Sequence, residues 1–368
     1  MSFQLLDAYL KVGKFLAITP LSVESNENSK FRQIQQVIVI LLTITCVTVS
    51  VYFRDYFLEY TFPKITLCLL SDIVLCTYCC RIVIEASKVL QWSELISGLK
   101  NTSCLLKEDD NDKKKWIQWK FVVPQLTFFS VVIYILQAWF SILGLWELIY
   151  VFEILQYYLQ FCHTMYLHTI LEMIRQRYEA LKHCFEKGFP KNDKNLHEMS
   201  CFAYTLKDIV NRFNDNFGWS LLLLITFTTL QFLNSLEYSL EYNIYGTEHA
   251  SHVIITQVLI ALLSFIPTSM VLLKFENIMA ESEELVFLVK KSTTTILDRN
   301  EREEMDRFGD IVANNLPEFS AARFFVLGRS TILSIFGTVA TFFIILITFV
   351  PNARLDAATA TNLTMLDN

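Results

Sequence analysis

Seven long apolar segments constrain this chain more than any other feature of its sequence. They cover residues 34–53, 62–83, 121–143, 148–170, 217–239, 253–273 and 324–350. About 20 mostly apolar residues in a helix are enough to cross the hydrocarbon core of a bilayer. Hydrophobic residues make up 53% of the chain, an amount that suits lipid better than water. The sequence therefore predicts an all-α membrane protein, residues 1–368, with seven transmembrane helices in one domain.

Lysine and arginine residues indicate how these helices are oriented. Of the 31 in the chain, 26 precede the first segment or follow the second, fourth and sixth segments. Only three lie on the other side, Arg54, Arg354 and Lys64 at the edge of the second segment, and Arg81 and Arg329 lie within segments. Cytoplasmic loops carry the excess of positive charge in membrane proteins. We therefore expect a cytoplasmic N-terminus and an extracellular C-terminus, where Asn362 of an Asn-Leu-Thr sequence is a candidate for glycosylation.

The two connections at 171–215 and 274–323 carry apolar residues at helical spacing among charged ones. This pattern predicts that the fourth, fifth and sixth segments continue as helices into the cytoplasm and pack there. An amphipathic loop on the membrane surface is the alternative. Pro124 and Pro267 lie inside two of the apolar segments, and membrane helices tolerate them.

Several functional classes do not fit. G-protein-coupled receptors also have seven spans, but their N-terminus is outside, and the last segment here lacks their Asn-Pro-x-x-Tyr sequence. An intramembrane aspartyl protease needs two carboxylates that share a proton, whereas Asp72 is alone in its segment. His163 and His168 are five residues apart, which puts them on different helix faces and makes a poor metal pair. We expect no enzyme, no cofactor, no metal and no nucleic-acid partner.

The last apolar segment carries a stripe of small polar residues. Its members are spaced by four, three, four and three residues, so they share one helix face: Ser334, Thr338, Thr341, Ile345 and Thr348. Hydroxyls on one face can bind passing water and ions, and an isoleucine among them can narrow and dewet a channel. Small residues also allow close packing between helices. The stripe by itself leaves both interpretations open.

The end of this segment carries a resemblance to a known family. Residues 341–349 read Thr-Phe-Phe-Ile-Ile-Leu-Ile-Thr-Phe. They resemble the Thr-Tyr-(five hydrophobic)-Gln-Phe motif that closes the last span of insect gustatory receptors. Thr341 and Phe349 match the motif, Phe342 replaces its Tyr, and Thr348 replaces its Gln. Residues 5–20 are also similar to the N-terminus of that family, and length, span number and orientation match over the whole chain.

The resemblance implies a tastant-gated, non-selective cation channel in the plasma membrane of chemosensory dendrites, surrounded by lipid. Four copies, identical or related, would assemble around a pore. Residues 324–350 would be the pore helix, and 171–215 with 274–323 would form a cytoplasmic anchor. Phe343 stands where sugar-sensing members have Glu, which favours a bitter or other non-sugar ligand. The pore-lining and gate residues implied are Ser334, Thr338, Thr341, Ile345, Thr348 and Phe349.

The family binds its ligand in the outer half of the helical bundle. Polar residues are costly in a span, about 1 to 3 kcal/mol for charged ones, so they usually have a role. Aromatic rings with a few hydrogen-bonding groups suit a mid-sized organic ligand, whereas hydrogen bonding between helices is the alternative for each residue. The candidates are Asp72, Tyr134, Gln137, Trp139, Glu153, Gln156, Tyr157, Gln160, Gln231, Asn234, Ser235, Tyr238 and Gln257.

Two other functions stay open at the level of sequence. An odorant receptor subunit of the same superfamily would need a co-receptor before it conducts. A passive transporter or structural membrane protein would use the hydroxyl stripe only for packing.

Overall fold

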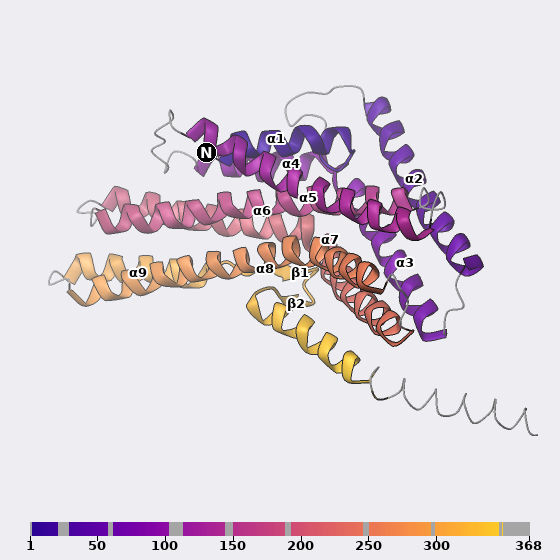
Figure 1. The fold of residues 1–368 in the computed structure, drawn as a ribbon. Helices are drawn as coiled ribbons and strands as arrows, with labels where there is room; N and C mark the ends of the chain where they lie inside the picture. Colours follow the sequence, from indigo (N-terminus) through magenta and orange to yellow (C-terminus); the bar gives the residue numbers. More distant parts are fainter. Residues whose placement is uncertain are drawn as a thin grey trace, which may run out of the picture.

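The structure, a computed structural model, describes residues 2–20, 29–57, 62–102, 113–143, 150–187, 193–245, 250–295, 299–345 and 348. Phe349 and Asn362, predicted as a gate residue and a glycosylation site, lie outside these residues. The labelled elements are α1 (Ser2–Phe15), α2 (Ser29–Phe57), α3 (Phe62–Glu85), α4 (Val89–Asn101), α5 (Lys113–Leu143), α6 (Tyr150–Lys187), α7 (Asp193–Tyr245), α8 (Ala250–Thr295), α9 (Arg299–Asn314), β1 (Ser320–Ala321) and β2 (Phe325–Val326). A last helix, Arg329–Ile345, has no label in Figure 1, and we call it the C-terminal helix.

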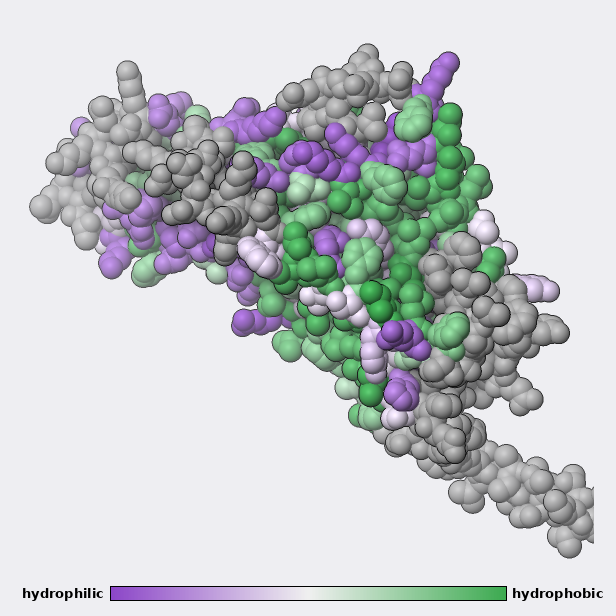
Figure 2. Space-filling view, turned by 45° about the horizontal axis from the view of Figure 1, so that its top comes forward, coloured by the Kyte–Doolittle hydropathy of each residue, from purple (hydrophilic) through white to green (hydrophobic). Residues whose placement is uncertain are grey.

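Six of the predicted spans lie in α2, α3, α5, α6, α7 and α8. The last three continue past their apolar segments as unbroken helices of 38, 53 and 46 residues. With α9 they project from the rest of the molecule, at the left of Figure 1. We call this part, residues 171–187, 193–215, 274–295 and 299–314, the stalk. Figure 2 shows hydrophilic residues gathered at that end, whereas hydrophobic residues cover much of the body.

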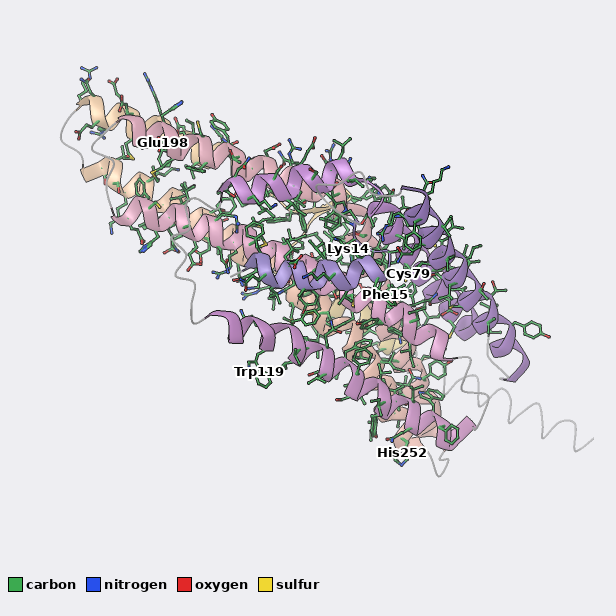
Figure 3. All side chains as sticks on the ribbon, turned by 90° about the horizontal axis from the view of Figure 1, so that it is seen from above. Lys14, Phe15, Cys79, Trp119, Glu198 and His252 are labelled. Atoms are coloured by element: carbon green, nitrogen blue, oxygen red, sulfur yellow. The ribbon has the colours of Figure 1, made fainter. Side chains whose placement is uncertain are left out.

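The two ends of the bundle are marked by residues labelled in Figure 3. Glu198, near the start of α7, lies in the stalk, and His252, near the start of α8, lies at the opposite end. Pro124 and Pro267 lie inside α5 and α8 without ending either helix, as the sequence predicts.

Five helices of the described chain are long and apolar enough to cross a membrane: α2, α3, α5, α7 and α8. The C-terminal helix is apolar but shorter. α6 is too polar to qualify by composition, and its surroundings explain why. It packs against α1, α2, α3, α7 and α8, so its polar residues face other helices of the same chain. A helix covered in this way needs no lipid-compatible surface of its own.

The core between body and stalk is largely aromatic. Phe213 of α7 packs against Phe275 of α8 and Phe319, with ring centroids 6.1 and 5.8 Å apart. Phe275 and Phe319 are themselves 4.6 Å apart and fully buried. Fully burying an aromatic side chain contributes about 1.5 to 3 kcal/mol. This cluster fixes the segment before the C-terminal helix against α7 and α8.

The predicted start of the last span, residue 324, is wrong: the helix begins at Arg329. β1 and β2 form a short antiparallel hairpin that pairs Ser320 with Val326 and Ala321 with Phe325. Ala322 and Arg323 at its turn have positive φ values of 49° and 65°. This left-handed backbone cannot continue a right-handed helix, so Phe325 and Val326 extend the hairpin although they are apolar.

α1 is tied to the start of α2. The Arg32 guanidinium and the Gln35 amide of α2 donate to the carbonyl oxygen of Lys14 at 3.1 and 3.0 Å. They add to the bond that the Ala17 backbone N–H donates to the same carbonyl group at 3.3 Å. The N-terminal residues that resemble the gustatory family therefore form a helix packed on α5 and α6.

Candidate functional site

The candidate ligand residues of α6 point into the bundle. Gln156 and Gln160 expose 2% and 3% of their surface. The Gln156 amide donates to the carbonyl oxygen of Thr43 in α2 at 3.1 Å, whereas Gln160 Oε1 has no hydrogen-bond partner among the described residues. Tyr157 is half-buried, with its ring 5.9 Å from that of Phe227 in α7. Glu153 is also half-buried.

A second group lies on α7 and α8. Gln231, Asn234 and Ser235 of α7 are buried, as is Gln257 of α8. Asn234 and the half-buried Tyr238 both contact the Cys68 thiol of α3, at 3.8 and 3.9 Å. Ser235 Oγ has no partner within the described part of the chain. The structure therefore brings Asn234 and Tyr238 against α3. It also leaves two buried polar oxygens, on Gln160 and Ser235, that can still accept a hydrogen bond.

The candidates on α5 are placed differently. Tyr134 and Gln137 lie on the exposed side of the helix, because α5 buries Val132, Ile135 and Ala138 instead. Trp139 on α5 and Asp72 on α3 are half-buried. The structure does not bring Tyr134 and Gln137 together with the buried residues of α6 and α7.

A buried polar contact in the same region was not predicted. The hydroxyl of Tyr78 in α3 lies 2.6 Å from Nδ1 of His163 in α6, and both residues are fully buried. The Tyr166 ring contacts His163 edge-on at 4.8 Å. Sequence reasoning considered His163 only as a metal ligand. A histidine in the middle of an apolar segment is itself a signal for a hydrogen-bonding partner on another helix.

The hydroxyl stripe of the C-terminal helix faces away from the bundle. Ser334, Thr338, Thr341 and Ile345 of this helix are exposed, and so is Thr348, which follows it. The packed side of the helix consists of Thr331, Ile335 and Val339, which are 4% to 7% exposed. Phe336 adds ring contacts to Phe265 of α8 at 5.2 Å and to Phe232 of α7 at 6.3 Å.

The hydroxyls of this stripe are oriented by their own helix. Ser334, Thr338 and Thr341 each donate to the carbonyl oxygen four residues earlier at 2.9 Å, and Thr348 does so at 2.7 Å. A hydroxyl has one hydrogen and two lone pairs, so donation inward leaves the lone pairs directed outward. Such a surface accepts hydrogen bonds from water and provides oxygen ligands for cations, but it offers no donor to an anion.

In the stalk, ion pairs join α6 to α8. Glu172 of α6 binds Lys274 of α8, and Lys182 of α6 lies 2.5 Å from Glu281 of α8. Arg175 bridges Glu172 at 3.1 Å and Glu281 at 3.5 Å. Burial by itself would raise the pKa of the Glu172 carboxyl, but the hydrogen bonds and charges of Arg175 and Lys274 outweigh it and lower the pKa to about 2.

Comparison with known proteins agrees with this architecture. The family pattern described as "7tm Chemosensory receptor" matches residues 6–352. No curated protein matches the chain. The structure is similar to that of the insect olfactory receptor OR5 from Machilis hrabei in complex with eugenol. The TM-score is 0.67 at 14% sequence identity, over 95% of this chain and 99% of that one. The structure of OR5 described without eugenol gives a TM-score of 0.62 at 14% identity, over 93% and 98%.

The match spans nearly the whole chain, and it includes the helix with the exposed stripe. The solved relatives with this fold are seven-span membrane proteins, which confirms the fold class predicted from the apolar segments. The family consists of receptors and not of enzymes. The chain belongs to the 7tm chemosensory receptor family, the superfamily of insect odorant and gustatory receptors.

Proposed function

We propose that this receptor is a tastant-gated cation channel of the gustatory type. The observation that carries the proposal is the exposed stripe Ser334, Thr338, Thr341, Ile345 and Thr348 on the C-terminal helix. In one copy of the chain these hydroxyls face outward although the helix is apolar. Four copies around a common axis would enclose them, and their outward lone pairs would suit water and permeant cations. Ile345 and Phe349 are the proposed narrow points.

The proposed ligand site lies among the buried polar residues of α6, α7 and α8. Gln160 Oε1 and Ser235 Oγ lack partners in the described chain, and a buried polar atom without a partner costs about 1 to 3 kcal/mol. A ligand with a hydroxyl or N–H group would satisfy them, and the aromatic surroundings suit an apolar ring or chain. Phe343, where sugar-sensing receptors of the family have Glu, favours a bitter or other non-sugar compound.

The test is to express the chain alone and record currents evoked by a panel of bitter and other tastants. The variant Gln160→Leu removes a buried amide, whereas the control Gln137→Leu removes an exposed one from α5. We expect the concentration for half-maximal current to rise about ten-fold or more for Gln160→Leu, the effect of losing about 1.4 kcal/mol. The Gln137→Leu variant should respond as the wild type does. Equal responses of the two variants would remove Gln160 from the site.

A second candidate is an odorant receptor subunit, because the two solved structures compared above are of an olfactory receptor. Such a subunit differs from the proposed gustatory channel because it needs a co-receptor. The chain alone would be silent and would conduct odorant-evoked current only with a co-receptor. The chain could also reach the cell surface as four-fold particles and yet conduct no current, either alone or with a co-receptor. A transporter or structural role would then remain.

We also propose that the stalk is a cytoplasmic anchor and that the chain spans the plasma membrane with its N-terminus inside. The placement of 26 of the 31 Lys and Arg residues supports this orientation. A C-terminal epitope tag should stain on intact cells. Staining that appears only after permeabilisation would reverse the orientation.

A further inference from the structure

The C-terminal helix begins with a cap from another helix. The first backbone N–H groups of a helix have no partner within it, and a side chain near its start usually accepts one of them. Here the residue before the helix is Gly328, which has no side chain. Instead, Oε2 of Glu276, in α8, accepts the backbone N–H of Arg329 at 3.2 Å. A carboxylate at this end also interacts favourably with the helix dipole.

Gly328 leaves the space that this cap occupies. A Cβ at this position would lie 3.0 Å from the same oxygen of Glu276, which is closer than ordinary carbon contacts. The Gly328 N–H is directed to Thr331 Oγ1 at 3.4 Å, so the first turn is closed by its own threonine on one side and by Glu276 on the other. The start of the C-terminal helix is therefore held by α8 through one specific acceptor.

The residues beside Glu276 connect the same turn of α8 to two other parts of the molecule. Lys274 binds Glu172 of α6, and Phe275 packs its ring 4.6 Å from that of Phe319, just before the hairpin. Three consecutive residues of α8 thus contact α6, the hairpin segment and the C-terminal helix. A shift or rotation of α8 at this turn must move the start of the C-terminal helix or break the cap.

The hairpin is held from the other side by α7. The Asn214 amide donates to the Glu318 carbonyl oxygen at 2.7 Å, and Arg323 pairs with Asp215 at 2.7 Å. Gly218 of α7 passes so close that a Cβ would lie 2.9 Å from the backbone nitrogen of Ala322. The chain entering the C-terminal helix therefore has a fixed position on α7. Glu276 is the polar contact through which α8 holds the start of that helix, beside the ring contacts of Phe275 with Phe319 and of Phe265 with Phe336.

α8 also carries a candidate ligand residue. Gln257 lies 19 positions before Glu276 on the same unbroken helix, about 28 Å along its axis. We propose that Glu276 is a positioning residue, which transmits movement of α8 to the start of the pore-lining helix. This inference rests on the proposed channel function and adds the route by which the ligand site would reach the pore.

The experiment compares Glu276→Ala with Glu283→Ala, recorded with the most effective tastant found for the wild type. Both variants remove one carboxylate from α8, but Glu283 is exposed. We expect the ratio of evoked to basal current to fall at least about five-fold in Glu276→Ala, the lower range of typical coupling between two sites. Glu283→Ala should keep the wild-type ratio. Ligand affinity, measured by direct binding, should change little in either variant.

Two further variants separate coupling from folding. Gly328→Ala brings a methyl group against the cap without changing any charge, and it should lower the same ratio. Glu276→Gln keeps an acceptor oxygen and should lie between wild type and Glu276→Ala. Wild-type ratios in both Glu276→Ala and Gly328→Ala would overturn the inference, as would loss of ligand binding in parallel with current. A wild-type chain that never conducts would instead reject the proposed channel function.

Discussion

α6 and the C-terminal helix are both apolar segments interrupted by polar residues, yet they place those residues in opposite ways. α6 directs Gln156, Gln160 and His163 into the bundle, where each is at most 3% exposed. The C-terminal helix directs Thr338 and Thr341 outward. The reason is the number of neighbours. α6 packs against α1, α2, α3, α7 and α8 and also contacts α4 and α5, whereas the described contacts of the C-terminal helix come from α7 and α8.

This difference separates two uses of polar groups in a membrane helix. In α6 they join helices within one chain, and their loss should reduce stability. In the C-terminal helix they donate to their own backbone and direct their lone pairs to the outer side of one copy of the chain, so their loss should affect assembly or conduction more than stability. The following predictions test that division, beginning with the largest effect on stability.

Arg177 is the most strongly bonded buried residue of α6. Its guanidinium donates to the carbonyl oxygens of Met173 at 2.7 Å and Leu99 at 3.0 Å, and to Thr102 Oγ1 at 3.2 Å, with no exposed surface. Arg177→Met should lower the free energy of unfolding by about 3 kcal/mol, because the three hydrogen bonds of the buried guanidinium are lost. Thermal unfolding in detergent measures the loss. The control Arg323→Met removes an exposed ion pair and should change stability by less than about 1 kcal/mol. Similar losses of stability in the two variants would contradict the view that the buried polar groups of α6 hold the bundle together.

Loss of the hydrogen bond between Tyr78 and His163 should have the next largest effect on stability. Tyr78→Phe leaves the buried imidazole without its partner and should cost about 1 to 3 kcal/mol. Tyr178→Phe is the matched control, since the buried hydroxyl of Tyr178 has no partner among the described residues. Removing an unpaired buried hydroxyl should leave stability unchanged or slightly raised. A larger loss at Tyr178 than at Tyr78 would mean that the polar contacts of α6 do not stabilise the bundle.

Cysteine labelling compares the two helices directly. Thr338 and Thr169 make the same hydroxyl bond, each to the carbonyl oxygen four residues earlier at 2.9 Å. Thr338 is exposed, whereas Thr169 of α6 is 3% exposed. In a background without the exposed Cys184 and Cys201, Thr338→Cys should react with a water-soluble thiol reagent and Thr169→Cys should not. Protection of Thr338→Cys to the level of Thr169→Cys would indicate that the stripe is a packing surface.

The smallest effect concerns the ion pairs of the stalk at low pH. The pKa of Glu172 lies near 2 in the folded chain, below its ordinary value of 4.5. A carboxyl whose pKa is lower in the folded than in the unfolded state stabilises the folded protein at pH values above the unfolded-state pKa. This contribution to stability disappears as the pH falls from about 4.5 towards 2. Glu172→Gln should therefore show a smaller fall in thermal midpoint over that range than the wild type. Identical pH dependence would show that Glu172 does not contribute.

Sequence patterns identified the helices well and their environments less well. Apolar runs located α2, α3, α5, α7 and α8, for which length and hydropathy suffice, and also α6, which is more polar. The spacing of the stripe placed its residues on one helix face, and in the structure that face is exposed. The outward position of Tyr134 and Gln137 was not evident, because a helix with apolar residues all round gives no signal for which face is covered. The start of the last helix was missed because left-handed turns at Ala322 and Arg323 carry no glycine or proline signal.

Contacts between distant residues were beyond the reach of the sequence. Glu276 and Arg329 are separated by 53 positions, and neither residue belongs to a recognisable capping pattern. The Tyr78–His163 pair joins α3 to α6 across 85 positions. Such pairs depend on how the helices are arranged around one another, which periodicity within a single helix does not encode.

The unbroken course of α7 has a consequence for the lengths that this chain can tolerate. A helix of 53 residues fixes the angle between the faces at its two ends as well as their separation. Each added or deleted residue in its middle would turn one end by about 100° relative to the other. Asn214, which contacts the hairpin, and Asn234, which contacts α3, would then no longer face their partners together. α7 therefore fixes both the distance and the rotation between its two ends. Insertions and deletions should be tolerated in the connections between helices and not within α7.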